Sequence, residues 1–175
     1  HQYNLIKVSI SQFYGIEIND FAVNVAKTAL WIAENQMMQE TENIVHMELD
    51  FLPLKTNAYI IEGNALRIDW QDVVAKEKLN YIMGNPPFVG QSMRNNEQSN
   101  DMNLIFGKGS IETKLDYVLC WYKKTVDFLI NTSNIKVAYV STNSICQGEA
   151  VPTFWKNMIQ NGVEIQFAYT SFKWN

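Results

Sequence analysis

The chain has 175 residues, of which 47% are hydrophobic and 18% charged, a composition ordinary for one globular domain with a sizeable core. Its net charge of −4 and isoelectric point of about 5.2 have the wrong sign for a module that mainly grips phosphate backbone. No apolar run could span a bilayer, and no basic-then-apolar leader opens the chain. We therefore expect a cytoplasmic protein with no membrane partner.

Cysteine and histidine are too sparse for a disulfide framework or an imidazole metal cluster. The two cysteines are Cys120 and Cys146, and the two histidines are His1 and His46. No metal site is predicted. Because the chain starts at His1 and ends on an apolar, strand-like stretch, we expect it to be truncated at both ends.

Strand-like segments alternate with helical patterns along the chain. A strand is predicted at 13–18, followed by Asn19 and Asp20, which suit a helix N-cap, and by a helix from Phe21 to about Gln39. Further strands are predicted at 58–62, 79–85, 135–145 and 163–169. A helix is predicted over 115–130, from apolar residues on one continuous face, and another from Pro152 to about Gln160, with Gly162 as its C-cap.

This alternation predicts a mostly parallel α/β sheet with right-handed crossovers. Ligands of such sheets gather at the carboxyl ends of the strands. Glu17 lies at the end of the first predicted strand, Asn64 just after the second, and Asn85–Phe88 at the end of the third. We therefore expect the functional site at this edge of the sheet.

The tetrapeptide Asn85-Pro86-Pro87-Phe88 carries the most specific chemistry. An asparagine carbonyl and the Pro86 carbonyl, on a backbone that the prolines hold rigid, form two fixed acceptors for both hydrogens of an amino group. Accepting both bonds frees the lone pair of a conjugated nitrogen for attack, and Phe88 would stack on the attached ring. The alternative interpretation is a rigid turn that closes a strand.

"GNPPF" resembles the catalytic motif of amino-methyltransferases that act on adenine N6 in DNA with S-adenosylmethionine. "FYGIEIND" resembles their second motif, which implies that Glu17 binds the cofactor ribose, with Ile18 beside it. "IEGNALRIDW" resembles the third motif, which implies that Asn64 contacts the cofactor adenine and that Ala65 lies beside the ring. Asn85 is also implied to contact the cofactor. The family usually has aspartate in the place of Asn64.

Longer strings, "ALWIAENQM", "LPLKTNAYIIEGNALRIDW", "LDYVLCWYKK" and "FAYTSFKW", resemble the methyltransferase segment of Type IIL/IIG single-chain restriction–modification enzymes. The resemblance covers about 13–174. It implies a class I S-adenosylmethionine-dependent methyltransferase fold, Rossmann-like, with helices on both faces of the sheet. Residues 1–175 would form the central part of one prokaryotic catalytic domain, without its glycine-rich first motif and its C-terminal target recognition region.

The implied partners are double-stranded DNA with a flipped adenine, S-adenosylmethionine, and other domains of the parent polypeptide. The isolated segment is expected to be inactive. The alternatives are a methyltransferase of another amine, in protein glutamine or ribosomal-RNA guanine, and a non-catalytic scaffold of a restriction enzyme.

Several other residues have two possible roles at this stage. Asp69 is a candidate helix cap, whereas Asp116 and Tyr117 are candidates for lining the cofactor or target pocket. The polar segment 91–109 is expected to be a long loop, either facing DNA or mobile. Phe172 and Trp174 are weaker candidates for stacking on a flipped base.

Overall fold

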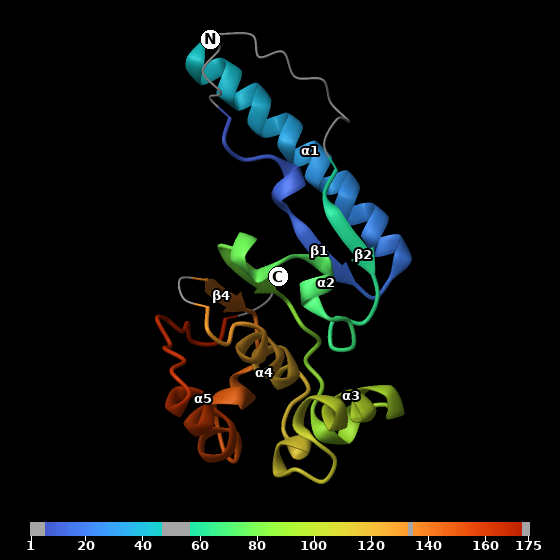
Figure 1. The fold of residues 1–175 in the computed structure, drawn as a ribbon, viewed down its shortest axis with the longest axis vertical. Helices are drawn as coiled ribbons and strands as arrows, with labels where there is room; N and C mark the ends of the chain where they lie inside the picture. The colour runs from blue at the N-terminus through green and yellow to red at the C-terminus, as the bar shows by residue number, and fades with distance from the viewer. Residues whose placement is uncertain (1–5, 47–56, 133–134, 173–175) are drawn as a thin grey trace. The chain divides into compact units, whose positions relative to one another are not determined.

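The computed structural model describes residues 6–46, 57–132 and 135–172, and it divides the chain into two compact units, His1–Val74 and Ala75–Asn175. Each unit contains one pair of parallel strands with helices beside it (Figure 1). The α/β class and the parallel pairing predicted from the sequence are confirmed. The described strands, however, form two two-stranded sheets and not one continuous sheet.

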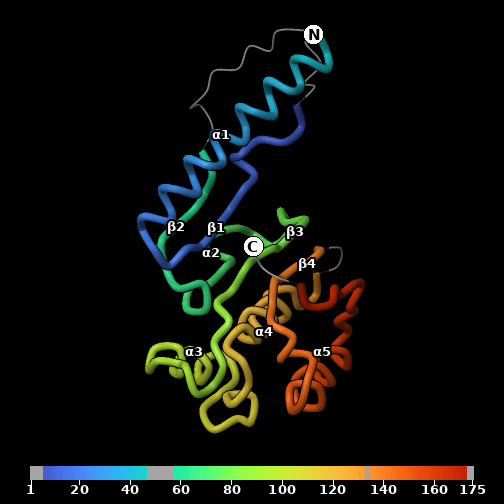
Figure 2. Tube along the Cα trace, turned by 180° about the vertical axis from the view of Figure 1, so that it is seen from behind, coloured from blue at the N-terminus to red at the C-terminus, as the bar shows by residue number. Residues whose placement is uncertain are grey.

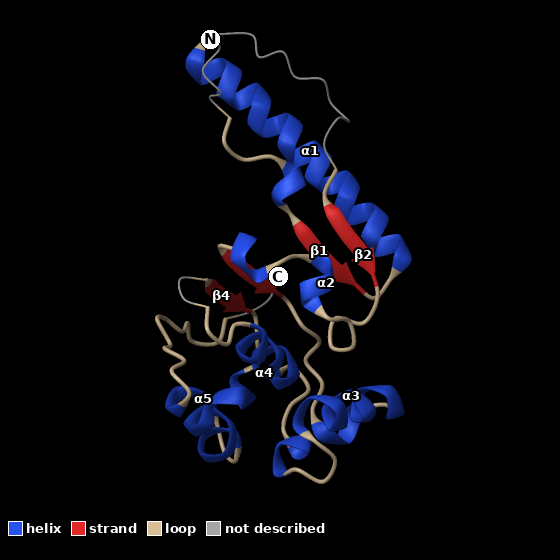
Figure 3. Cartoon of the chain, viewed as in Figure 1, coloured by secondary structure: helices blue, strands red, loops and turns tan. Residues whose placement is uncertain are grey.

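The first unit is built on β1 (Tyr14–Glu17) and β2 (Tyr59–Glu62), which pair in parallel from Tyr14 opposite Tyr59 to Glu17 opposite Glu62. The long helix α1 (Asp20–Val45) lies between them in sequence and packs beside both strands in space (Figure 3). As predicted, Asn19 is its N-cap, because the Asn19 side chain accepts the Ala22 N–H at 3.0 Å. A single turn, α2 (Trp70–Val73), closes the unit.

Helix α1 runs six residues further than the predicted Gln39, and only part of its apolar surface is buried. Val23 and Met38 are in the core, whereas Val25, Ile32 and Met37 are at least half exposed. The helix carries apolar residues on more than one side, and within this unit one sheet can cover only one of them. The exposed apolar positions are therefore not core positions of this unit.

The second unit contains β3 (Tyr81–Gly84) and β4 (Lys136–Tyr139), which run side by side as a parallel pair from Tyr81 opposite Lys136 to Gly84 opposite Tyr139 (Figure 2). Helix α4 (Leu119–Phe128) connects them in the chain and contacts Tyr139. On the other side of β3, Tyr81 is 64% and Met83 75% exposed. Within the second unit, the described helices therefore cover one face of this sheet, whereas helices on both faces were predicted.

The core of the second unit lies between α4 and the C-terminal helical segment. That segment starts as a short π-helix at Val151–Trp155 and continues as α5 (Lys156–Gln160). Gly162, with φ of 88°, ends it as predicted, because the N–H groups of Gly162 and Val163 bond to carbonyls of the last turn. The buried cluster consists of Leu115, Val118, Leu119, Ile145, Ala150, Phe154 and Met158.

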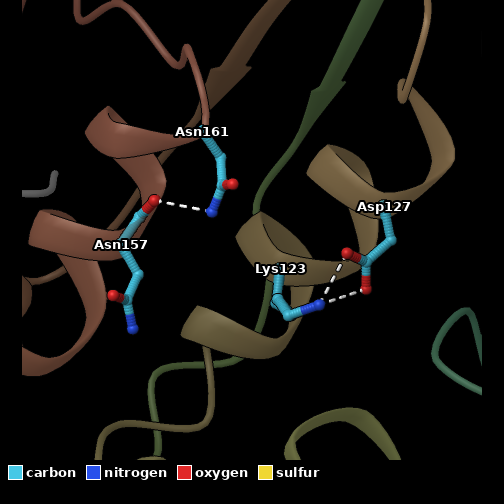
Figure 4. A network of polar contacts seen from close by, with 4 residues as sticks. All are labelled: Lys123, Asp127, Asn157 and Asn161. Carbon is cyan, nitrogen blue, oxygen red and sulfur yellow. Dashed lines mark hydrogen bonds and ion pairs between the residues drawn. The ribbon is translucent and has the colours of Figure 1, made fainter.

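Helix α4 is shorter than the predicted 115–130. Leu115 is buried but belongs to the turn before the helix, and Ile130 lies beyond its end and is 56% exposed. The apolar spacing continues beyond both ends of α4, and the prediction from this spacing therefore made the helix too long. On the polar side, Lys123 pairs with Asp127 one turn later, at 2.5 Å, and just after α5 the Asn161 side chain donates to the Asn157 carbonyl at 2.8 Å (Figure 4).

Two predictions about irregular and strand structure are wrong. The segment 91–109, expected to be a long loop, contains helix α3 (Asn96–Phe106), whose capping box joins Asn95 and Gln98. The segment 163–169, expected to be a strand, has no strand partner among the described residues, and Ile165, Phe167 and Tyr169 are exposed. A β-strand pattern yields a strand only where a neighbouring backbone completes the ladder.

Within the described residues, no helix is long and apolar enough to cross a membrane. Nor do three or more His, Cys, Asp or Glu side chains gather there in a group that could hold a metal ion.

Candidate active site

In the first unit, the structure brings the predicted cofactor residues to one end of a strand pair. Glu17 is the last residue of β1, and its backbone carbonyl accepts the N–H of Gly63, the residue after β2, at 2.8 Å. Its half-buried carboxylate accepts the Asn19 N–H at 3.1 Å. Ile18, next along the chain, is 68% exposed. A carboxylate and an open apolar side chain therefore lie side by side at this edge.

Asn64 forms a local turn that the sequence analysis did not foresee. Its side-chain oxygen accepts the Leu66 N–H at 2.9 Å, and its backbone carbonyl accepts from Arg67 and Ile68. Leu66, only 1% exposed, anchors this turn in the core. The pattern is an Asx-turn, for which an asparagine just after a strand is the sequence indication.

The residues after Asn64 are also fixed. Ala65 is half-buried, and its carbonyl accepts the Trp70 indole N–H at 2.8 Å. Asp69 caps α2 by accepting the Gln71 N–H at 2.9 Å, which confirms its predicted structural role. Gly63 has a φ of 155°, and a Cβ atom added there would lie only 2.4 Å from the Ile68 Cδ1 atom, so this position requires glycine. The turn therefore brings Asn64 and Ala65 to the edge where Glu17 ends β1.

In the second unit, the tetrapeptide is held at both ends. Gly84, just before it, accepts the Val140 N–H at 3.1 Å, and Val89, just after it, accepts the Tyr117 N–H at 3.0 Å. Between these two anchors the backbone carries Pro86 and Pro87, each with φ fixed by its ring. The segment is thus a rigid bridge between β3 and the start of α4.

Inside this bridge, the groups proposed to bind an amine have no hydrogen-bond partner among the residues that the structure describes. Asn85 is exposed, and its side chain forms no hydrogen bond with any residue that the structure describes. Nor does a described residue donate to the Pro86 carbonyl, although the proline itself is buried. Phe88 is 45% exposed. The Asn85 side chain therefore does not turn into the core, where it would be unable to bind a ligand.

The bridge rests on Tyr139, a residue that the sequence analysis missed. A Cβ atom on Gly84 would lie 3.2 Å from the Tyr139 ring, so glycine leaves space for the ring at this position. The Tyr139 hydroxyl shares a 2.6 Å hydrogen bond with that of Thr125 on α4, and its ring packs edge-on against Tyr122. Burial raises the pKa of Tyr139 to about 12, partly offset by the Thr125 bond. Tyr139 lies in a short apolar strand, and nothing in the sequence indicates that its ring packs against Gly84.

Asp116 and Tyr117, the candidate pocket residues, have structural partners. Tyr117 is 4% exposed, and its hydroxyl donates to the buried Asp101 carboxylate at 2.7 Å. Asp116 is half-buried and accepts a short hydrogen bond from the Ser144 hydroxyl. Phe172 is 67% exposed. Trp174, the other weak candidate, lies outside the described residues.

These features define an α/β protein with short parallel strands, polar residues at the strand ends and an exposed Asn-Pro-Pro-Phe bridge. A family model described as "MmeI, DNA-methyltransferase domain" matches residues 1–175. The chain belongs to this family of MmeI DNA-methyltransferase domains.

Two known proteins are similar to this chain. "DNA methyltransferase A" of Bacillus subtilis (strain 168) is 46% identical over 170 residues, which are 95% of this chain and 19% of that protein. The structure of the Type IIL restriction–modification enzyme MmeI in complex with DNA superposes with a TM-score of 0.91 at 39% identity, covering 98% of this chain and 23% of that one. The chain thus spans about a fifth of the length of these relatives.

Proposed function

We propose that residues 1–175 are the central part of one class I methyltransferase catalytic domain, in a restriction–modification enzyme that methylates adenine N6 in DNA. The observation that carries this proposal is the exposed Asn85 side chain, unpartnered within the described structure, in a bridge held at both ends. Membership of the MmeI DNA-methyltransferase domain family supports DNA as the substrate.

The proposed chemistry of the bridge follows from its two acceptors. The Asn85 side-chain oxygen and the Pro86 carbonyl accept the two N–H bonds of the adenine amino group. In this geometry the nitrogen becomes more tetrahedral, and its lone pair no longer delocalises into the ring. Because the prolines and the two backbone anchors fix the acceptors beforehand, little reorganisation is needed during the reaction.

The target base must leave the duplex, because its amino group is not reachable within the stack. Phe88, with 45% of its surface exposed, offers a ring face to the extruded adenine. Stacking positions the base while Asn85 and Pro86 hold its amino group. Positioning of this kind accounts for a large share of the rate in reactions between two bound partners.

The residues of the first unit fit the nucleoside part of S-adenosylmethionine. The Glu17 carboxylate suits a ribose diol, the exposed Ile18 suits the face of an adenine ring, and the Asn64 amide suits its polar edge. Ala65, beside Asn64, leaves room for the ring. When bound, this cofactor supplies an electrophilic methyl group. The proposal therefore assigns the cofactor nucleoside to the first unit, whereas Asn85 acts at the methyl acceptor.

The test is Asn85→Ala in the complete polypeptide, with Asn35→Ala on the exposed side of α1 as the matched control. Loss of one preorganised hydrogen-bond partner should lower kcat for DNA methylation by about 100-fold or more. S-adenosylmethionine affinity, measured by calorimetry, should change by less than about threefold, since removing a group from the acceptor cradle leaves Glu17 and Asn64 intact. Near-normal methylation by Asn85→Ala would refute the assigned role.

The same polypeptide separates the alternatives. Transfer of a labelled methyl group to duplex DNA, and not to RNA or ribosomal protein, is the expected result. Preferential labelling of ribosomal-RNA guanine or protein glutamine would identify another acceptor. A scaffold would show no S-adenosylmethionine binding in calorimetry.

A further inference from the structure

A polar cavity of about 290 Å³, open to solvent, lies in the second unit, a few residues after the bridge. Its lining consists of Gln91, Arg94, Ser99, Asn103 and Thr113. Each of these side chains can donate a hydrogen bond, and none of the five is acidic. Gln91 follows Phe88 by three residues, so their Cα atoms lie within about 11 Å of each other. The cavity and the bridge thus share one short segment of chain.

Arg94 is the charged residue of this cavity, and its charge is only partly compensated. One guanidinium nitrogen, Nη2, donates to the Thr113 carbonyl at 2.8 Å, whereas the buried Nε has no hydrogen-bond partner in the described part of the chain. No carboxylate of the described residues lies within ion-pair distance of it. Burial lowers the pKa of Arg94, opposed by the nearby Cys120 and Asp116. A guanidinium nevertheless stays charged in proteins, and a half-buried, unpaired charge favours an anionic ligand.

Helix α3 fixes the other donors. Asn95 and Gln98 form its capping box, and Ser99 and Asn103 lie one turn apart on the side that faces the cavity. The Ser99 hydroxyl already donates to the Asn95 carbonyl at 2.9 Å, which leaves Gln91 and Asn103 as the side-chain amides available beside Arg94. A guanidinium with flanking amides is the donor set that phosphate oxygens accept.

We propose that this cavity binds a phosphate group of the DNA backbone beside the flipped adenine. This inference rests on the proposed function. In a chain with a net charge of −4, a local cation beside the bridge allows a phosphate to approach despite the unfavourable overall charge. Phosphate contacts set register without reading sequence, and a nucleotide that swings out of the stack turns about its own backbone. Arg94 is therefore a positioning residue that holds this backbone while Asn85 holds the base.

The test measures duplex binding by the complete polypeptide as a function of salt concentration, without S-adenosylmethionine so that no turnover occurs. Arg94→Met keeps an unbranched, flexible stem but removes the charge, and Arg94→Lys keeps the charge. Arg94→Met should weaken binding about tenfold and lower the slope of log affinity against log salt by about one, whereas Arg94→Lys should retain the slope. Lys123→Met removes an equal charge from the Lys123–Asp127 pair on α4 and should leave the slope unchanged.

A second measurement locates the phosphate without relying on a variant that must fold. Duplexes with one neutral methylphosphonate, placed in turn at each position near the target adenine, should show one position where affinity falls about tenfold. In Arg94→Met that position should lose its effect. Inorganic phosphate is included as a competitor, and competition only at millimolar or higher concentration is expected for a site built for DNA.

The outcomes separate the two proposals. If wild-type protein binds and methylates DNA, yet Arg94→Met keeps the salt slope and every methylphosphonate position behaves alike, the phosphate site is wrong and the proposed function stands. If the polypeptide does not bind duplex DNA at all, the proposed function itself fails. A lower melting temperature of Arg94→Met with an unchanged slope would show that Arg94 serves only the Thr113 carbonyl.

Discussion

The geometry of the bridge depends on the absence of a side chain at Gly84. Gly84 precedes Asn85 and faces the Tyr139 ring, where an added Cβ would be 3.2 Å from the ring and thus tighter than ordinary contact. Tyr139 cannot yield easily, because its hydroxyl is bonded to Thr125 and its ring packs on Tyr122. Any side chain at Gly84 must therefore displace β3 or the ring.

We expect Gly84→Val to destabilise the second unit by about 1–3 kcal/mol, as overpacking in a core does, and to lower methylation more strongly than cofactor binding. The matched control is Gly90→Ala in the same segment, where the added Cβ would meet only the Asp116 Oδ1 atom at an ordinary 3.6 Å. Thermal unfolding and methylation assays on the complete polypeptide measure both effects. Equal behaviour of the two variants would contradict the steric argument.

At the scale of elements, α3 shows how local hydrogen bonding produces a helix from a polar segment. Its sequence, NEQSNDMNLIF, has little apolar content, yet Asn95 and Gln98 close a reciprocal capping box at its start. On its inner side, Asp101 and Met102 are each 1% exposed, and Asp101 is bonded to Tyr117. The polar sequence of this segment led to the prediction of a loop. The sequence could not show that Asp101 would be buried, because its partner Tyr117 is brought to it by the tertiary fold.

Asn95→Ala should therefore cost about 1 kcal/mol of helix stability, the usual effect of losing an N-cap. Amide hydrogen exchange over α3 should accelerate about fivefold, since this free energy corresponds to that factor in the opening equilibrium. Asn96→Ala, one residue on and exposed, is the control and should leave exchange unchanged or slightly slower, because alanine favours helix. If both variants exchange alike, the capping box does not stabilise α3.

At the scale of the whole molecule, the two units differ in how much core they contain. The second unit has the continuous cluster between α4 and α5, whereas α1 in the first unit buries only the separate side chains of Val23 and Met38 among its described residues. Both units leave apolar side chains of their sheets exposed, including Tyr59 in β2 and Met83 in β3. Parallel sheets are ordinarily covered on both faces, so these short pairs are incomplete as sheets.

Cys120, at 0% exposure, provides a probe of the second unit as a whole. Burial, reinforced by nearby Asp101, raises its pKa from 9.0 to about 12. In the complete polypeptide we expect iodoacetamide at pH 8 to modify the exposed Cys146 quickly and Cys120 only when the unit unfolds. Mass spectrometry of the two peptides, with and without denaturant, measures this. Equal labelling of both thiols in the folded protein would contradict the buried core.

The same shift fixes the direction of a pH effect. Because the folded pKa of Cys120 lies above its ordinary value, the associated stability is fully present below about pH 9 and is lost as pH rises towards 12. Denaturant titrations across this pH range should show that the free energy of unfolding falls as the pH rises. Cys120→Ala should reduce the fall without abolishing it, because Tyr139 has a raised pKa as well.

Local patterns in the sequence were sufficient for the α/β class, β1 to β3, the caps at Asn19, Asp69 and Gly162, and the position of the tetrapeptide after β3. They also located β4, although the predicted strand 135–145 ends at Tyr139 and Asn143–Cys146 forms a 3-10 turn. These features depend on residues near each other in the chain, where propensity and turn chemistry act directly. Only the tertiary structure decided that 163–169 is not a strand, that 91–109 contains a helix, and that Tyr139 supports Gly84. Such features depend on which distant backbone or ring lies alongside, and that is set by packing.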